Sequence, residues 1–154
     1  MDREQARKVL AEAGYQPGQL KTVIRSANIY QQEAEVVQQH LAAIGIDARI
    51  DLEGATFTAI LQKGDFELAW GARGGFLYAN FWLGDFLHSQ SRLNDSRLKD
   101  ARGDALIEAH AREMDLAQRK QIIAQLQDRL YELMPFVPVL SNYYHHFASC
   151  RLQN

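Results

Sequence analysis

Several features are scarce in this chain of 154 residues, and each scarcity excludes something. The single cysteine, Cys150, cannot form an internal disulfide, and it leaves the redox compartment undetermined. No apolar run approaches the roughly 20 residues that a membrane span requires. The N-terminal stretch MDREQARKVL also lacks the apolar core of a signal peptide. Taken literally, the sequence is that of a cytoplasmic chain that does not span a membrane.

An excess of positive charge is also missing. The chain has 17 basic and 19 acidic residues, which gives a formal net charge of -2. No broad positive field is available to hold a phosphate backbone, so we expect no nucleic-acid partner for these residues. The composition, 47% hydrophobic and 23% charged, is that of a globular protein, and the length predicts one domain spanning residues 1–154.

The usual signatures of catalysis and metal binding are absent as well. None of the five histidines pairs with another at helical i, i+4 spacing, and no second cysteine accompanies them, so a zinc site has little support. The stretch GARGG lacks the spacing and the Lys-Ser/Thr ending of a phosphate loop. No Gly-x-Ser-x-Gly elbow occurs, and Cys150 lies in no nucleophile motif. We therefore expect no enzyme activity, no cofactor and no metal.

The first part of the chain has the pattern of a βαβ unit. After a helix over residues 3–13, a β-prone stretch covers 20–25 and an apolar stripe at helical spacing covers 30–44. Residues 46–52 then alternate apolar and polar side chains, as a strand with one polar face does. Strand, helix and strand in this order predict a parallel pair with a right-handed crossover.

The second part of the chain is less regular. A short helix with Phe57, Ile60 and Leu61 on one face precedes a predicted strand over 66–70. Residues 71–103 are rich in Gly, Asn, Asp and Ser, and only NFWLGDFLH has the pattern of a helical turn. The remaining predicted elements are a helix over 103–114, a longer helix from the cap Asp115 to about 133, and an extended segment between Pro135 and Pro138.

The stretch from 63 to 86 concentrates the aromatic residues, since it holds both tryptophans and five further rings. A ligand-binding lip and an ordinary buried strand with a turn both explain this composition, and core packing is favoured for any single ring. An arginine among glycines at a strand end is harder to explain as core. Arg73 offers a planar fork for a carboxylate or phosphate, at the strand end where open α/β sheets bind ligands. The candidate ligand-binding residues are Trp70, Arg73, Gly74, Phe76 and Tyr78.

Four motifs in order resemble the family 5 extracellular solute-binding proteins, which serve peptide, dipeptide and nickel ABC transporters. They are ARKVLAEAGY, EAEVVQQHLAAIGIDARIDL, ATFTAILQKGDFELAW and LYELMPFVPVL, and the resemblance runs over about residues 2–148. The resemblance implies an α/β fold with a βαβ-containing mixed sheet flanked by helices, one lobe of a type II periplasmic-binding-protein clamshell. These residues would form the C-terminal lobe, with the N-terminal lobe absent. It further implies non-catalytic capture of a peptide or other small-molecule ligand in the periplasm or outside the cell, and delivery to an ABC permease.

One stretch departs from the family pattern. After KGDF, peptide-binding members usually continue into an acidic, proline-containing segment whose aspartate takes the ligand's amino group. Here the segment is shorter and has neither an acid nor a proline between Glu67 and Asp85. Gly74 or Phe76 takes the aspartate's place, depending on the side from which the segment is aligned, and Arg73 can fall where the family has tryptophan. We therefore expect no peptide-amine recognition; an arginine in place of the acid favours a carboxylate-bearing ligand, or none.

Two further interpretations remain open at this point. The chain could be the effector-sensing domain of a cytoplasmic transcriptional regulator, or the product of a truncated gene that binds nothing. Because half a clamshell cannot enclose a ligand, we expect weak binding by the lobe alone. We also expect Trp70, Arg73 and Tyr78 to face the open side of the lobe, and exposed apolar surface to favour self-association.

Overall fold

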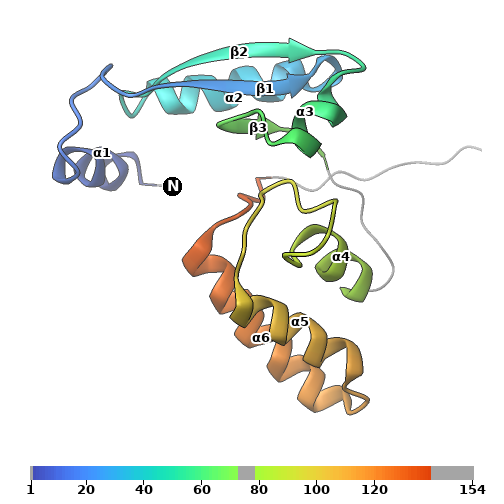
Figure 1. Cartoon of the computed structure of the whole chain (residues 1–154). Helices are drawn as coiled ribbons and strands as arrows, with labels where there is room; N and C mark the ends of the chain where they lie inside the picture. The colour runs from blue at the N-terminus through green and yellow to red at the C-terminus, as the bar shows by residue number, and fades with distance from the viewer. Residues whose placement is uncertain (1, 73–78, 140–154) are drawn as a thin grey trace, which may run out of the picture.

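Two groups of elements make up the fold, which a computed structural model describes for residues 2–72 and 79–139. The first, which we call the sheet unit, consists of β1 (Lys21–Ala27), β2 (Asp47–Glu53), β3 (Leu68–Trp70), α2 (Gln31–Ala42) and α3 (Phe57–Lys63). The second, the helical unit, consists of α4 (Ala79–Phe86), α5 (Ala101–Arg112) and α6 (Leu116–Leu133). Figure 1 shows the sheet unit as one layer, the helical unit as a layer below it, and α1 (Arg3–Glu12) standing to one side.

The sheet has the strand order β2-β1-β3, and both pairings are parallel. The alternation in β2 decides which side chains are covered. Ala48 and Ile50 lie on the face of α2, together with Ile24 of β1, which is only 1% exposed and pairs in register with Ile50. Ala34 of α2 completes the buried part of this core, and Val37 and Leu41 of the same helix pack around it.

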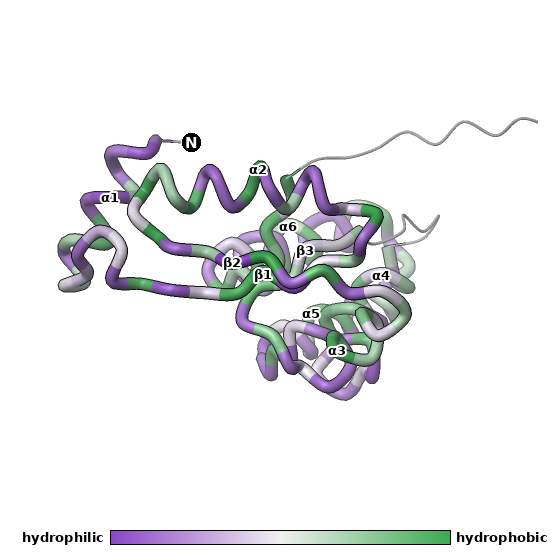
Figure 2. The backbone as a smooth tube through the Cα atoms, turned by 90° about the horizontal axis from the view of Figure 1, so that it is seen from above, coloured by the Kyte–Doolittle hydropathy of each residue, from purple (hydrophilic) through white to green (hydrophobic). Residues whose placement is uncertain are grey.

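The two helices of the sheet unit cover opposite faces of the sheet. Seen from above in Figure 2, α2 lies on one side of the strands and α3 on the other. This arrangement follows from the connections. The chain crosses from β1 to β2 in one direction along the sheet, and from β2 past β1 to β3 in the opposite direction. Both crossovers can be right-handed only if α2 and α3 lie on opposite faces of the sheet.

The helical unit is held by a second apolar core. Leu83 and Leu87 come from α4 and the residue after it, Ile107 from α5 and Leu126 from α6. Asp100 and Asp115 cap the two longer helices, because their carboxylates accept hydrogen bonds from the backbone N–H groups of Gly103 and Gln118. Asp100 also receives two hydrogen bonds from Arg129, at 2.9 and 3.0 Å, which tie the start of α5 to α6.

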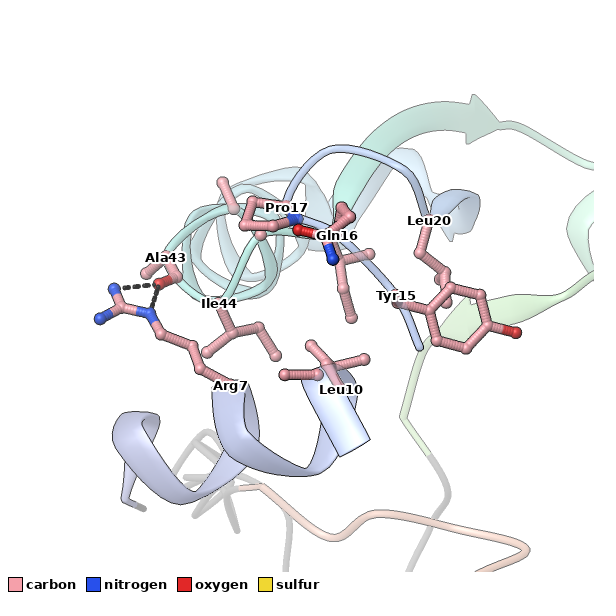
Figure 3. Close-up of a pocket in the computed structure, with 12 residues that line it drawn as sticks. Arg7, Leu10, Tyr15, Gln16, Pro17, Leu20, Ala43 and Ile44 are labelled. Atoms are coloured by element: carbon pink, nitrogen blue, oxygen red, sulfur yellow. Dashed lines mark hydrogen bonds between the residues drawn. The ribbon is translucent and has the colours of Figure 1, made fainter. Parts of the chain in front are cut away.

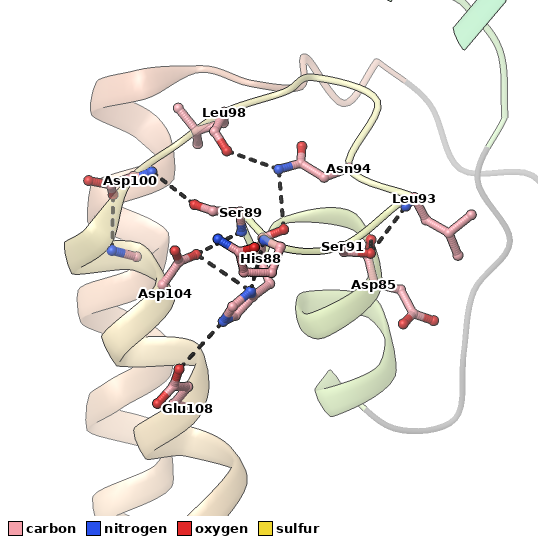
Figure 4. A network of polar contacts seen from close by, with 12 residues as sticks. Asp85, His88, Ser89, Ser91, Leu93, Asn94, Leu98, Asp100, Asp104 and Glu108 are labelled. Carbon is pink, nitrogen blue, oxygen red and sulfur yellow. Dashed lines mark hydrogen bonds and ion pairs between the residues drawn. The ribbon is translucent and has the colours of Figure 1, made fainter. Parts of the chain in front are cut away.

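Polar side chains order the connection between α4 and α5, as Figure 4 shows. The amide of Asn94, only 7% exposed, donates to the carbonyl oxygens of His88 and Leu98. The Ser91 hydroxyl donates to the carbonyl of Asp85 at 2.6 Å, and the Ser89 backbone N–H donates to Asp104 at 2.8 Å. The connection is thus fixed by side chain to backbone hydrogen bonds and contains no regular element.

One contact joins this connection to the sheet unit. Arg97, at a left-handed φ of 54°, donates from Nη2 to the carbonyl of Gln62 at the end of α3, at 3.0 Å. Gly64 ends α3 with a φ of 68°, and a Cβ there would come within 2.2 Å of Arg97 Nε. Glycine at this position therefore allows Arg97 to reach the end of α3.

Most of the predicted elements are confirmed, with four differences. Strand β1 continues to Ala27, and β3 begins at Leu68 instead of residue 66. The stretch predicted as irregular contains the full helix α4. The segment from 134 to 139 contains neither helix nor strand, and the extended segment expected between Pro135 and Pro138 stays a prediction. The α/β class with a βαβ unit and flanking helices is confirmed, whereas the expected mixed sheet has only parallel pairings within residues 2–72 and 79–139.

Candidate functional site

The carboxyl ends of the three strands define the candidate site. Because the strands are parallel, Ala27, Glu53 and Trp70 all end at the same edge of the sheet. The connection from β1 leads to α2 on one face, and the chain returns to β3 from α3 on the other face. A crevice opens between neighbouring strands at such a point, and it is where open α/β sheets bind ligands. In this fold the point lies between the ends of β1 and β3.

The residues that follow β1 and β2 meet at this edge. Asn28 begins a 3-10 turn over Asn28–Tyr30, and a Cβ on Gly54, just after β2, would lie 4.0 Å from its amide nitrogen. Ile29, in the same turn, is 79% exposed. The edge therefore presents an amide and an exposed apolar side chain, which are groups suited to a small organic ligand.

The carboxylate at the end of β2 is already engaged. Glu53 Oε1 accepts from Arg25 at 2.7 Å, and Oε2 accepts from the Thr56 hydroxyl at 3.0 Å. Arg25 also lies 3.3 Å from Asp51, which pairs with Arg49 at 3.0 Å. This chain of charges covers the sheet face opposite α2, and it leaves little unpaired negative charge at the end of β2.

Trp70 ends β3 and packs partly against the core. Its register partner on β1 is Ser26, which is fully buried, and its ring packs against the cluster of Ile24, Ala34 and Ala48. Gly71 follows, and a Cβ there would come within 3.1 Å of the Phe57 ring of α3. The end of β3 is thus held between the α2 face and α3.

The other four predicted ligand-binding residues, Arg73, Gly74, Phe76 and Tyr78, lie outside the described residues, so the expected arrangement of Trp70, Arg73 and Tyr78 stays a prediction. Sequence reasoning missed Asn28, Ile29 and Gly54. The rule that open α/β sheets bind ligands beyond the carboxyl ends of their strands, which pointed to Arg73, is the signal that could have found them. The predicted first strand ended at residue 25, so the rule did not point to residues 28 and 29.

A second hollow lies at the opposite edge, by the amino ends of β1 and β2. Figure 3 shows a groove of about 480 Å³ between α1 and the turn after α2, lined mainly by apolar side chains such as Leu10, Tyr15 and Ile44. The Arg7 guanidinium spans it and donates two hydrogen bonds to the carbonyl of Ala43, at 2.6 and 3.1 Å. These bonds anchor α1 at the C-terminal end of α2, where a cation is favourable.

The histidine and carboxylates near the start of α5 form a structural group. His88 Nδ1 accepts from the Gln90 backbone N–H at 3.2 Å, and Nε2 lies 3.6 Å from Glu108. The Arg129 hydrogen bonds lower the pKa of Asp100. Within residues 2–72 and 79–139, no set of three or more His, Cys, Asp or Glu side chains is placed to hold a metal ion. None of the helices described in that range has both the length and the apolar composition that crossing a bilayer requires.

Comparison with known families decides the relationship of this chain. The family described as the middle region of the bacterial extracellular solute-binding proteins, family 5, matches residues 1–92. The chain belongs to this family. A comparison with curated protein sequences gives no significant match.

Solved structures of binding proteins share the fold of this family 5 chain. The periplasmic binding protein DppA from Helicobacter pylori, in complex with the peptide STSA, is 25% identical with a TM-score of 0.78, over 89% of this chain and 28% of its own. AppA from Bacillus subtilis, in complex with a nonapeptide, is 21% identical with a TM-score of 0.72, over 87% and 30%. NikZ from Campylobacter jejuni, in complex with Ni(L-His), is 18% identical with a TM-score of 0.76, over 87% and 31%. The chain therefore spans less than a third of the length of each of these proteins.

Proposed function

We propose that this chain is a ligand-binding lobe of an ABC transporter solute-binding protein, that it corresponds to the C-terminal lobe, and that it acts without catalysis. The observation that carries the proposal is the strand order, which places the carboxyl ends of the parallel strands β1 and β3 side by side in a chain of family 5. Residues 1–154 then form one domain, and the bound solute is a peptide or another small molecule. The alternative of an effector-sensing domain in a cytoplasmic regulator has no support among the matched proteins.

The ligand-binding residues we propose are Trp70, Arg73, Gly74, Phe76 and Tyr78. In the sequence their segment begins at Trp70, the last residue of β3, whose neighbour in the sheet is β1. Arg73 brings a positive charge to a segment that has no acid between Glu67 and Asp85. Because Glu53 across the edge is already engaged by Arg25 and Thr56, little negative charge opposes an anion there. We therefore propose that Arg73 holds a carboxylate of the ligand.

Compartment and partner follow from the family. The lobe would capture its solute in the periplasm or outside the cell, and as part of the full-length protein it would deliver that solute to an ABC permease. A partner lobe would close over the ligand during capture. One lobe alone contacts a ligand from one side, so its affinity is weak, with a Kd of about 1 mM or more.

The test measures binding of three probes to the full 154-residue chain. The probes are the peptide Ser-Thr-Ser-Ala, Ni(L-His)2 and succinate, at about 10 mM, which is tenfold above a Kd of about 1 mM. Saturable binding of any probe, seen as changes in amide chemical shifts at the strand ends, supports the proposal. Absence of such changes with all three probes contradicts it.

A variant tests the role of Arg73. We expect Arg73→Ala to fold normally and to weaken a carboxylate-bearing probe by roughly 1.5 to 3 kcal/mol, because a charge-assisted hydrogen bond is lost. For the peptide, amidation of the C-terminus should weaken binding as the variant does, whereas acetylation of the N-terminus should have little effect. Unchanged affinity of Arg73→Ala for the carboxylate probe would remove Arg73 from the site.

A further inference from the structure

A pocket in the helical unit has, among the described residues, none in common with the strand-end site. It has a volume of about 540 Å³, and it lies where the first turn of α4 meets the end of α5 and the first two turns of α6. Its lining residues are Ala79, Asn80, Phe81, His110, Leu116, Arg119, Lys120 and Ile123. This volume is in the range of sites that hold small organic molecules.

The lining divides into an apolar side and a cationic side. Phe81, Leu116 and Ile123 supply an aromatic ring and two branched aliphatic side chains. Arg119 and Lys120 supply two positive charges, and none of the lining residues within the described part of the chain is acidic. The first turn of α4 adds the positive end of its helix dipole. Such a lining suits a molecule with a flat apolar body and one negative group.

Two nitrogen atoms of the lining residues have unmet hydrogen-bonding capacity. His110 is only 3% exposed, and its Nδ1 has no hydrogen-bond partner among the described residues. Arg119 Nε, also buried, likewise has none. A buried polar group without a partner destabilises the folded chain, and a ligand atom that pairs with it offsets this cost. A polar ligand atom that pairs with one of these groups therefore gains more binding free energy than it would from a group already hydrated at the surface.

The Arg119 guanidinium is held at the pocket by one weak contact. Arg119 Nη2 donates to Asn80 Oδ1 at 3.4 Å, which is long for a hydrogen bond and is made on the exposed surface. When a carboxylate replaces the Asn80 oxygen, the guanidinium can turn its Nε–H and Nη–H groups to the carboxylate together. Lys120, on the same helix, is exposed and can approach the same anion.

Two of the three titratable lining residues carry a positive charge, and the third is a histidine. They are His110 from α5 and Arg119 and Lys120 from α6, while Ala79, Asn80 and Phe81 of α4 carry no titratable side chain. Burial, and secondarily the charge of Arg119, lowers the pKa of His110. The imidazole is therefore neutral at pH 7, and a bound anion would favour its protonated form.

We propose that this pocket binds a small aromatic carboxylate, with the ring against Phe81, Leu116 and Ile123 and the carboxylate between Arg119 and Lys120. This site is independent of the strand-end site. We expect loss of one to leave the other intact, because no residue of the described part of the chain is common to both. It gives the helical unit a ligand of its own.

The test titrates the full chain with phenylacetate and, separately, with phenylacetamide, its neutral counterpart. Calorimetry gives the affinity, and amide chemical shifts give the location. We expect phenylacetate to shift the amides of residues 79–81 and 116–123 and to bind at least about tenfold more tightly than phenylacetamide. No binding of phenylacetate, or equal binding of the two probes, would overturn the proposal.

Two variant pairs test the residues. Arg119→Gln should weaken phenylacetate roughly tenfold, while Arg102→Gln, an exposed arginine on α5 outside the pocket, should not. If Arg119→Gln fails to fold, the exposed Lys120→Gln, with Lys99→Gln as its control, gives the same comparison with a smaller loss of about threefold. Equal losses within a pair would show a general effect of charge and would also overturn the proposal.

Discussion

The sheet unit and the helical unit are stabilised in different ways. In the sheet unit, backbone pairing fixes the strands, and the fully buried part of the core consists of Ile24 and two alanines. In the helical unit, side chains do most of this work. Four larger aliphatic residues form the core, and Asn94, Ser91 and Asp100 hold the connections with their own polar groups.

The difference teaches where function can lie in each unit. The position of the strand-end site is set by the strand order and the crossovers, so it depends little on any one side chain. The pocket of the helical unit depends on particular residues, above all on Arg119 and Lys120. The strand-end site should therefore survive substitutions that abolish the pocket.

The largest expected effects come from the two cores. Leu126 is 2% exposed and Ile24 is 1% exposed, so Leu126→Ala and Ile24→Ala should each lower the free energy of unfolding by about 2 to 5 kcal/mol, through lost burial and a residual cavity. Trp82 packs against the core of the helical unit and Trp70 against that of the sheet unit. Urea unfolding followed by fluorescence in Trp70→Phe and Trp82→Phe backgrounds reads the two units separately.

If residues 1–154 form one domain, each core substitution shifts the unfolding midpoint seen by both tryptophans. A shift that Trp82 alone reports for Leu126→Ala would mean that the units unfold independently. That result would contradict the single-domain proposal.

A smaller effect is expected where the two units touch. Gly64→Ala should lower the free energy of unfolding by about 1 to 3 kcal/mol, because φ is positive and the new Cβ would displace Arg97 from Gln62. Gly84→Ala in α4 is the matched control. Among the described residues, a Cβ at Gly84 would meet no atom within 4 Å outside its own stretch of helix. Gly84→Ala should therefore leave the free energy of unfolding unchanged or raise it slightly. Similar thermal stability of both variants would show that Arg97 does not join the units.

The smallest effect concerns the ion pair of the helical unit. The Arg129 hydrogen bonds lower the pKa of Asp100 in the folded state, so this carboxylate stabilises the fold above its unfolded pKa of about 3.9. The stabilisation is lost as the pH falls through the folded pKa. Asp100→Asn should therefore be less stable than the wild-type chain by about 1 kcal/mol at pH 7, and the difference should shrink below pH 4.

The control for this pair is Asp115→Asn, which changes a helix cap with no ion pair among the described residues. Urea unfolding at pH 7 and at pH 3 measures both variants. A difference for Asp100→Asn that stays constant with pH would show that the lowered pKa contributes nothing to stability.

The sequence predicted the regular elements well where a pattern repeats. The alternation of β2 and the capped, striped helices are local signals, and the structure confirms them. Helix α4 was predicted only as a helical turn, because Gly84, Asn80 and Asp85 are weak helix formers, and the helix is stabilised by packing of Leu83 and Phe86, both buried. The fixed conformation of residues 87–100 could not be predicted either, because it depends on side chain to backbone hydrogen bonds of Ser91 and Asn94. From composition alone, a stretch rich in Ser and Asn is expected to be an irregular loop.

The candidate site could be predicted only in part. The predicted strand over 66–70 ended correctly at Trp70, the last residue of β3. Asn28 and Gly54, in contrast, come together only when β1 and β2 are paired in register. The pocket around His110 brings together residues from three helices. No spacing in the sequence indicates that these residues meet.

The central claim is that the sheet unit binds solute at its strand ends. The most direct measurement follows backbone amide chemical shifts of the chain during titration with Ser-Thr-Ser-Ala, Ni(L-His)2 and succinate in turn. The account predicts that at least one probe gives saturable shifts gathered at residues 28–30, 53–56 and 70–72, in the wild-type chain and also in Arg119→Gln. Shifts confined to the helical unit, or no shifts with any of the three probes, would contradict it.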